Sequence, residues 1–565
     1  MTDRIWLGQY QAGVPADADV AAYRSINQIV AESCSRFRER PAFTNMGATL
    51  TFDDLDRLTR QFGAWLQQAA GLKPGDRVAI MMPNCLQYPV ALFGALRAGC
   101  AIVNVNPLYT PRELEHQLND SGATAIVIME NFAHTLGAVI ERTRVRTVVT
   151  TQLGDLLGFP KSLLVNLVLR YVKKMVPPWR IPGTVTLTKA LAQGAGMSLA
   201  EPEVGPEDIA FLQYTGGTTG VSKGAVLTHG NMVANMQQAH AWLAPALSPE
   251  GERVITALPL YHIFALTANC MVFMKIGGLN ILITNPRDMK GFVKELQKER
   301  WSVITGVNTL FNGLLNTPGF DQIDFSGLRV SFGGGMAVQR AVAERWKAVT
   351  GCPLIEAYGL TETSPAACIN PLNNPEYTGA IGVPISSTLV SIRDEQMREL
   401  PLCRPGMDQA TCVGELCIKG PQVMRGYHNR PDETAKVLTP DRWLRTGDLG
   451  YMDERGYIYI VDRKKDMILV SGFNVYPNEV ESVAVTHPGV LEAAAIGVPD
   501  ERSGEVVKLV VVKKDPALTA EALIEHCRKE LTAYKVPRIV EFRTSLPKTN
   551  VGKILRRELR EAAPA

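Results

Sequence analysis

The 565-residue sequence lacks several patterns that would assign it to a class at once. Its ten cysteines are scattered, and no two of them have the Cys-x-x-Cys spacing of a structural zinc site. This scatter favours reduced thiols and a cytosolic compartment. The first residues include acid, polar groups and proline, unlike a secretory signal peptide. No segment repeats at a period of about 20–50 residues, which excludes a solenoid.

Neither sign of charge is in large excess. Lysine and arginine total 59 against 56 aspartate and glutamate, giving a net charge of +3. So small an excess argues against nucleic acid as the main partner. Hydrophobic residues make up 46% and charged residues 20%, which excludes a disordered or fibrous chain. At roughly 150 residues per domain, the length corresponds to about four domain-sized units.

Long uncharged runs are scarce, but the segment 254–274 has no charged residue and is long enough to cross a bilayer. It contains Pro259, His262, Thr267 and Asn269, and such polar groups are costly in lipid. We therefore predict a buried strand, loop and helix here. A transporter function, which would need this span, is disfavoured.

Short apolar runs alternate with helical patterns through most of the chain. The runs 77–82, 123–129, 302–307 and 328–332 have the length of buried strands, and 86–98 has a helical pattern. This alternation predicts βαβ units and mainly parallel sheet.

A change in composition at 462–466, Asp-Arg-Lys-Lys-Asp, predicts a domain boundary. The roughly 100 residues that follow have the size of a small domain. We expect an α/β protein with a large N-terminal domain (1–461), a linker (462–466) and a small α+β domain (467–565).

The stretch 156–200 contains six basic residues and no acidic residue. Within it, pairs of apolar residues from Leu163 to Val176 recur every four positions, the spacing of one helix face. A basic amphipathic helix over 161–176 can lie in a membrane interface. An ordinary surface helix packed on its own domain is the alternative, and the sequence leaves both open.

The strongest chemical signal is the segment 214–224, Tyr-Thr-Gly-Gly-Thr-Thr-Gly-Val-Ser-Lys-Gly. Its glycines allow backbone N–H groups to converge on an anion, and its hydroxyls and lysine add donors and a positive charge. It is not a Walker A loop, because a glycine follows the lysine. We predict a polyphosphate site made by Tyr214, Thr215, Gly216, Gly217, Thr218, Thr219, Gly220, Lys223 and Gly224.

This segment resembles the phosphate loop of the adenylate-forming enzymes, the family of acyl-CoA synthetases, firefly luciferase and peptide-synthetase adenylation domains. Similar segments follow in the family's order within about residues 30–560, at 333–335, 356–363, 414–416, 425–427, 446–448, 462–466 and 547–553. Segments 443–449 and 461–481, and the basic helix after Lys161, are most similar to the bacterial long-chain fatty acid–CoA ligases. The resemblance implies a small, mobile C-terminal domain that rotates about a hinge at Asp462.

The resemblance also implies a reaction in which ATP transfers AMP to a carboxylate and CoA then displaces the AMP. Because two anions must react, catalysis depends on positioning and charge neutralisation. In this scheme Thr215 and Glu362 hold Mg²⁺ on the phosphates, which suits hard oxygen ligands. Thr361 donates to the α-phosphate and Tyr358 stacks near the adenine.

Other nucleotide contacts are implied in the same way. The glycines at 333–335 (Gly333, Gly334 and Gly335) let the base approach the backbone, and Gly359 belongs to the second nucleotide motif. Asp448 accepts both ribose hydroxyls. Arg463 reaches the ribose or a phosphate from the domain junction.

Besides Thr215 and Glu362, two more side chains are assigned to catalysis, and one backbone position is assigned to CoA. Lys553 bridges the carboxylate and the α-phosphate as charge builds between them, although its surroundings alone indicate an ordinary basic helix start. His262 lies beside the acyl pocket, with a satisfied core histidine as the alternative. Gly472 lines the path of the pantetheine thiol.

The implied function is an ATP-dependent long-chain fatty acid:CoA ligase with Mg²⁺ as cofactor and fatty acid, ATP and CoA as substrates. The implied location is cytoplasmic, with peripheral contact to the inner face of the membrane through 161–176. Alternatives are a fatty-acyl-AMP ligase that serves a carrier protein, a medium-chain or aryl acyl-CoA synthetase, and a non-catalytic nucleotide-binding scaffold. The sequence does not determine the acyl chain length. A homodimer is possible, but no sequence pattern indicates one.

Overall fold

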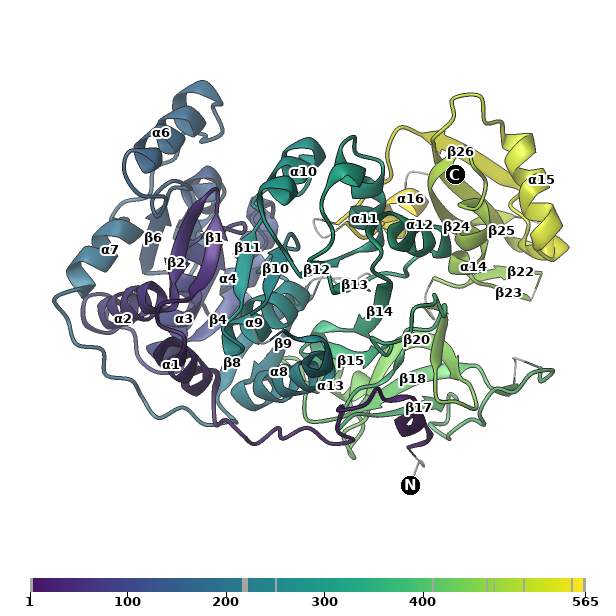
Figure 1. The fold of residues 1–565 in the computed structure, drawn as a ribbon, viewed down its shortest axis with the longest axis horizontal. Helices are drawn as coiled ribbons and strands as arrows, with labels where there is room; N and C mark the ends of the chain where they lie inside the picture. Colours follow the sequence, from purple (N-terminus) through teal and green to yellow (C-terminus); the bar gives the residue numbers. More distant parts are fainter. Residues whose placement is uncertain are drawn as a thin grey trace.

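The computed structural model describes residues 4–215, 222–248, 251–408, 411–463, 466–471, 473–500, 503–549 and 552–561. The fold is mixed α/β, as predicted, with a large N-terminal region and a smaller C-terminal region that has its own sheet (Figure 1). In Figure 1 the C-terminal region, in yellow-green, lies at the opposite end of the molecule from α6.

The first sheet of the large region has the strand order β19-β9-β8-β4-β3-β5-β6-β7. Its strands are β3 (Arg77–Met81), β4 (Ala101–Asn104), β5 (Ala125–Met129), β6 (Thr147–Thr151), β7 (Val185–Thr186), β8 (Ile209–Thr215), β9 (Lys223–Thr228) and β19 (Gly426–Tyr427). All neighbours from β8 to β7 are parallel, whereas β9 and β19 are antiparallel additions. The predicted strands at 77–82 and 123–129 are β3 and β5, so this part of the prediction is confirmed.

The second sheet has the order β16-β15-β14-β13-β12-β10-β11-β1-β2. Its strands are β1 (Pro41–Asn45), β2 (Ala48–Thr51), β10 (Arg253–Thr256), β11 (Leu279–Leu282), β12 (Val303–Gly306), β13 (Val330–Gly334), β14 (Leu354–Gly359), β15 (Ala366–Ile369) and β16 (Val383–Pro384). Its centre, from β1 to β14, is parallel. The carboxyl ends of β12, β13 and β14 therefore meet at one edge, where parallel α/β sheets bind ligands.

Helices cover these sheets on both faces, which explains the continuous apolar runs of their strands. They are α1 (Ile26–Arg36), α2 (Phe52–Gln68), α3 (Gln87–Arg97), α4 (Pro111–Ser121), α5 (Ala133–Gly137), α6 (Lys161–Leu167), α7 (Leu187–Gly194), α8 (His229–Leu243), α9 (Val272–Lys275), α10 (Met289–Lys298), α11 (Asn308–Leu315), α12 (Arg340–Thr350) and α13 (Pro431–Val437). Helix α3 is the helix predicted at 86–98, and every one of its residues is buried.

Two smaller sheets lie on either side of the charged segment 462–466. The antiparallel sheet β17-β18-β20-β21 contains β17 (Leu389–Arg393), β18 (Gly414–Lys419), β20 (Leu444–Met452) and β21 (Ile458–Arg463). The C-terminal sheet contains β22 (Ile468–Val470), β23 (Phe473–Val475), β24 (Val490–Asp500), β25 (Gly504–Lys513) and β26 (Ile539–Arg543), with helices α14 (Pro477–Ala484), α15 (Ala520–Glu530) and α16 (Arg556–Glu561). Its apolar clusters are built from residues after Asp466, so this region has a core of its own.

The uncharged segment 254–274 is divided between β10, a π-helical turn at Ala265–Met271 and α9. Most of its residues are buried in the large region, as predicted. Across the described ranges, the chain forms no helix with the length and hydropathy needed to span a bilayer.

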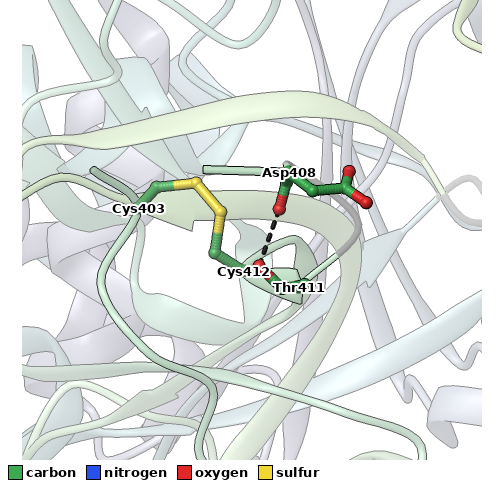
Figure 2. The surroundings of a disulfide bond; sticks show 4 residues. All are labelled: Cys403, Asp408, Thr411 and Cys412. Atoms are coloured by element: carbon green, nitrogen blue, oxygen red, sulfur yellow. Dashed lines mark hydrogen bonds between the residues drawn. A yellow bond between two sulfur atoms is a disulfide. The ribbon is translucent and has the colours of Figure 1, made fainter. Parts of the chain in front are cut away.

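The expectation of reduced cysteines is wrong for one pair. Cys403 and Cys412 form a disulfide in the connection between β17 and β18 (Figure 2), and the other eight cysteines are free and buried. A turn in which the Thr411 hydroxyl donates to the Asp408 carbonyl, at 2.7 Å, lies between them. The Cα atoms are 5.4 Å apart, within the usual range for a disulfide. A separation of nine residues matches no metal or redox motif, so no pattern in the sequence indicates this pair.

The predicted amphipathic helix at 161–176 begins as α6 and continues as a π-helical turn, Val168–Val172. In Figure 1 α6 projects from one end of the molecule, away from the sheets. Exposed apolar side chains gather on this segment: Phe159, Leu163, Leu164, Leu167, Tyr171, Val172 and Met175. The opposite face of the helix packs on the large region: Val165 contacts its core, and the Asn166 side chain accepts from the Gly154 N–H and donates to Asp155. The helix is therefore a surface helix packed on its own domain that also presents an exposed apolar face.

Candidate active site

A pocket with about 870 Å³ of empty space, open solvent at its mouth included, lies at the carboxyl ends of β12, β13 and β14. One wall is a single face of α8, and another is the π-helical turn at 265–271. Lys553 closes the cavity from the C-terminal region. Other lining residues include His262, Phe264, Phe273, Val303, Thr305, Gly334, Gly335, Tyr358, Gly359, Leu360, Thr361 and Ile369. Most of the lining side chains are apolar. Thr305, Tyr358 and Thr361 lie at or just beyond the ends of β12 and β14, whereas His262 and Lys553 come from other segments.

The polyphosphate segment forms a β-hairpin in which β8 and β9 pair Tyr214 with Gly224 and Thr215 with Lys223. The predicted residues Gly216, Gly217, Thr218, Thr219 and Gly220 lie outside the described residues. The Tyr214 hydroxyl donates to Asp120 of α4 at 2.7 Å, and Arg430 pairs with the same carboxylate at 2.7 Å. The base of the hairpin is thus fixed to the body of the protein.

Lys223 is partnered within the protein. Its ammonium forms an ion pair with Glu433 of α13 and lies 5.4 Å from the centre of the Tyr427 ring. Glu433 also pairs with Lys436 at 2.5 Å, and hydrogen bonds from these two lysines lower the pKa of Glu433 to about 2. Sequence reasoning missed Glu433, because a glutamate in the first turn of a helix usually has only a local role.

Glu362 follows β14 in a short 3₁₀ turn, Thr361–Thr363. The Tyr427 hydroxyl donates to Glu362 Oε1 at 2.7 Å, while the backbone N–H of Met424 donates to the Glu362 carbonyl at 2.8 Å. Burial and the Glu362 carboxylate raise the pKa of Tyr427. The family resemblance includes the segment 425–427, but it does not indicate that Tyr427 contacts Glu362.

Asp448 and Arg463 face each other on paired strands, β20 and β21. The Tyr358 hydroxyl donates to Asp448 Oδ2 at 2.5 Å, and Arg463 Nε lies 3.2 Å from Asp448 Oδ1. Tyr358, predicted to stack near an adenine, thus also holds the Asp448 carboxylate in place. Both carboxylate oxygens are oriented, as a group that binds a vicinal diol requires.

The glycines of the site permit close backbone approach. A Cβ atom at Gly334 would lie 2.9 Å from the Ala357 carbonyl oxygen, and one at Gly359 would lie 1.9 Å from that of Pro365. Gly335 has φ +78°, and a Cβ there would be 3.4 Å from Lys553 Cε. Gly333, the first of this group, lies within β13 against Val338.

Lys553 belongs to the C-terminal region but lies in the cavity of the large region. Its hairpin is closed by a Thr549 N–H to Lys553 carbonyl bond of 2.7 Å, and Thr309 of α11 donates to the Gly552 carbonyl at 3.2 Å. Burial lowers the pKa of Lys553 to about 8, and Arg463 acts in the same direction. Its neighbour His262 is half-buried in the cavity wall, and desolvation together with Lys553 lowers the pKa of His262 to about 3. His262 is therefore neutral at physiological pH.

The structure thus gathers Thr361, Tyr358, Gly334, Gly335, Gly359, His262 and Lys553 around one cavity. Asp448 and Arg463 lie next to the cavity, because Asp448 accepts from the lining residue Tyr358 and pairs with Arg463; Glu362 directly follows the lining residue Thr361. Gly472 lies outside the described residues.

Comparison with known proteins places this cavity in a family. Residues 30–428 match the AMP-binding enzyme family, and residues 479–553 match its AMP-binding enzyme C-terminal domain. A long-chain-fatty-acid–CoA ligase of Escherichia coli O6:H1 is 57% identical over 99% of this chain and 98% of its own length. One of Haemophilus influenzae is 53% identical over 99% of this chain and 98% of its own length.

A solved structure supports the same assignment. The ATP-bound MatB of Rhodopseudomonas palustris is 27% identical, with a TM-score of 0.77 over 95% of this chain and 98% of that one. Sequence motifs, architecture and relatives therefore agree, and the chain belongs to the AMP-binding enzymes, the adenylate-forming family.

Proposed function

We propose that this protein is an ATP-dependent long-chain fatty acid:CoA ligase. In the first step a carboxylate oxygen bonds to the α-phosphorus of ATP, and pyrophosphate leaves. In the second step the CoA thiol attacks the acyl carbonyl, and AMP leaves. The observation that carries the proposal is the position of Lys553, a cation from the second domain that closes an apolar cavity beside Tyr358 and Thr361.

The cavity has the composition that a fatty chain requires. Ala239, Leu243, Phe273, Val303 and Ile369 line it and contain no polar side-chain atom. Burying a methylene against such a wall is worth about 0.8 kcal/mol. The identity to long-chain-fatty-acid–CoA ligases supports the long-chain class over the medium-chain and aryl alternatives.

Magnesium suits the residues that are present. The described residues contain no cluster of three or more His, Cys, Asp or Glu side chains able to hold a metal by themselves. Mg²⁺ is commonly held by one or two carboxylates together with substrate phosphates. Thr215 and Glu362 would hold it in this way, and it would neutralise charge on the phosphates.

The segment 462–466 is proposed as the hinge between a large domain (1–461) and a small domain (467–565). The separate apolar clusters of the C-terminal region support this division. Rotation there would withdraw Lys553 and bring the segment around Gly472 to the cavity for the thiol. Residues 464, 465 and 472 lie outside the described residues.

We also propose that the segment 161–176 contacts membrane lipid, placing a cytoplasmic enzyme at the inner face of the membrane. The exposed apolar side chains of this segment support the proposal, as do Lys173 and Lys174, which are also exposed. Apolar side chains beside lysines favour an anionic lipid surface.

The activity is tested by supplying fatty acids of increasing length with ATP. Acid-dependent exchange of pyrophosphate into ATP, followed by AMP release that requires CoA, is the expected result. Product release that needs a carrier protein and not CoA would favour the fatty-acyl-AMP ligase. Failure of every carboxylate to support exchange would indicate a non-catalytic scaffold.

The membrane contact is tested by flotation with phosphatidylglycerol vesicles. Leu164→Ser combined with Tyr171→Ser should reduce binding several-fold. Ile539→Ser removes an apolar side chain of comparable exposure from β26 and should leave binding unchanged. Equal binding by all three proteins would contradict the proposal.

A further inference from the structure

Arg556 links several segments at the junction of the two regions. It is the first residue of α16 and lies three positions after Lys553. Its guanidinium donates to both carboxylate oxygens of Glu481, from Nε at 3.0 Å and from Nη2 at 2.8 Å. Nη2 also donates to Asn478 Oδ1 at 2.6 Å. These bonds fix α16 to α14 within the C-terminal region.

The same guanidinium faces two further carboxylates. Arg556 Nη1 lies 3.6 Å from Asp462 Oδ1 and 3.6 Å from Asp466 Oδ2. Asp462 lies at the start of the proposed hinge and still within β21, the last strand of the large region, whereas Asp466 follows in the connection to β22. One arginine therefore joins the last strand of the large region to the segment that carries Lys553.

Asp462 depends on these contacts because its side chain is fully buried. Its carboxylate accepts the backbone N–H of Arg463 at 2.7 Å and that of Asn478 at 3.0 Å. Burial raises the pKa of Asp462 to about 6, and Arg556 opposes this shift. A buried carboxylate without a cationic partner is strongly unfavourable, so loss of Arg556 would weaken this junction.

Asp462 also precedes Arg463, whose side chain pairs with Asp448 next to the cavity. Arg556 therefore acts at both ends of the site. Its contact with Asp462 links it to β21, the strand that contains Arg463. Because Arg556 follows Lys553 by three residues, it also anchors the hairpin that carries Lys553. Arg556 is not among the described residues that line the cavity, so neither sequence pattern nor position in the cavity marks it.

We infer that Arg556 is a positioning residue for the first half-reaction, holding Lys553 in the cavity by tying its hairpin to Asp462. The inference rests on the proposed ligase function and on rotation about 462–466. Rotation would separate Arg556 and the Asn478 N–H from Asp462, so these contacts stabilise the arrangement in which adenylation occurs. They have no role once Lys553 has withdrawn.

The test compares the two half-reactions in Arg556→Met. Adenylation, measured by pyrophosphate exchange, should fall by roughly tenfold to a hundredfold. Thioester formation from supplied acyl-AMP and CoA should stay within about twofold of the unchanged protein. Arg556→Lys, which can pair with one carboxylate but not form the two-pronged contact, should recover part of the loss.

Two controls separate positioning from folding. Arg528→Met removes an exposed arginine of the same domain that pairs within its own helix, with Glu525, and should leave both half-reactions unchanged. Asp462→Asn should reduce adenylation as Arg556→Met does. The double variant should lose little more than either single variant, because both changes break the same Arg556–Asp462 contact.

The outcomes are distinct. Equal loss of both half-reactions in Arg556→Met, or additive losses in the double variant, would overturn the inference and leave Arg556 a structural residue. Unchanged adenylation in Arg556→Met would overturn it as well. Absence of acid-dependent exchange in the unchanged protein would instead refute the proposed function.

Discussion

Replacing Lys553 by methionine would remove the mobile cation from the cavity while keeping most of the side-chain length. Lys553 Cε lies 3.4 Å from the position of a Cβ built at Gly335, so the end of this side chain passes directly beside the Gly335 backbone. We expect adenylation to fall by at least a hundredfold, because loss of one donor to developing charge costs about 2.7–4 kcal/mol. Thioester formation from supplied acyl-AMP should persist, since the lysine has no part in that step.

The pH dependence of adenylation gives a second measure of the same residue. Burial lowers the pKa of Lys553 from 10.5 to about 8, with Arg463 assisting and with Asp448 and Glu362 opposing. The charged form then predominates by roughly ten to one at pH 7 and falls to roughly one in ten at pH 9. For the free enzyme, kcat/KM for adenylation should therefore fall as pH rises through about 8.

The free energy of unfolding should rise with pH over the range in which the rate of adenylation falls. Between pH 8 and 10.5 the unfolded chain binds more protons at Lys553 than the folded protein, so the free energy of unfolding rises with pH in that window. The full shift of about 2.5 pH units corresponds to an upper bound of about 3 kcal/mol. Lys553→Met should lack this rise.

The assays are pyrophosphate exchange and thioester formation at several pH values, with urea unfolding of the ligand-free protein. Lys548→Met is the matched control, because Lys548 lies on the same hairpin but pairs with Glu492 at 2.5 Å. Equal loss of both half-reactions in Lys553→Met, or an adenylation rate that stays flat from pH 7 to 9.5, would refute this account of the site.

Three further changes test separate contacts. Tyr427→Phe removes the hydrogen bond to Glu362, which is worth about 1.5–3 kcal/mol. The KM for ATP with Mg²⁺ should rise about tenfold, and a nucleotide affinity equal to that of the unchanged protein would argue against a role for this bond. Asp448→Asn should weaken ATP binding tenfold or more in a titration, whereas unchanged binding would remove Asp448 from the ribose site. Gly359→Ala should lower the free energy of unfolding by several kcal/mol in a urea titration, because the new Cβ would overlap the Pro365 carbonyl oxygen. A stability equal to that of the unchanged protein would show that β14 can shift to make room.

Those parts of the fold that depend on local patterns were predictable. Strands such as β3 and β5 are buried on both faces, so their apolar runs indicate them without any tertiary information. The family motifs also indicated Lys553. Among the described residues that line the cavity, Ile369 is the nearest to Lys553 in the sequence, and it lies more than a hundred positions earlier. Residue spacing alone would have left it an ordinary basic residue.

What could not be predicted depends on contacts between distant elements. Nothing in the sequence near Glu433 indicates that it faces Lys223, since α13 reaches the hairpin only when β19 pairs with β9. The Cys403–Cys412 bond arises from a turn in a long connection, with no spacing rule behind it. The helix at 161–176 was recognised, but the exposure of its apolar side chains is visible only in the structure.

The pairing of Lys223 with Glu433 has a consequence for which anions the free enzyme admits. A tethered carboxylate competes for the lysine at a local concentration that a dilute monovalent anion cannot match. A phosphate group that binds Lys223 has to exchange for the Glu433 carboxylate, so its net gain in binding free energy is smaller than an unpaired lysine would give. Glu433 thus sets how strongly an anion must bind in order to reach Lys223.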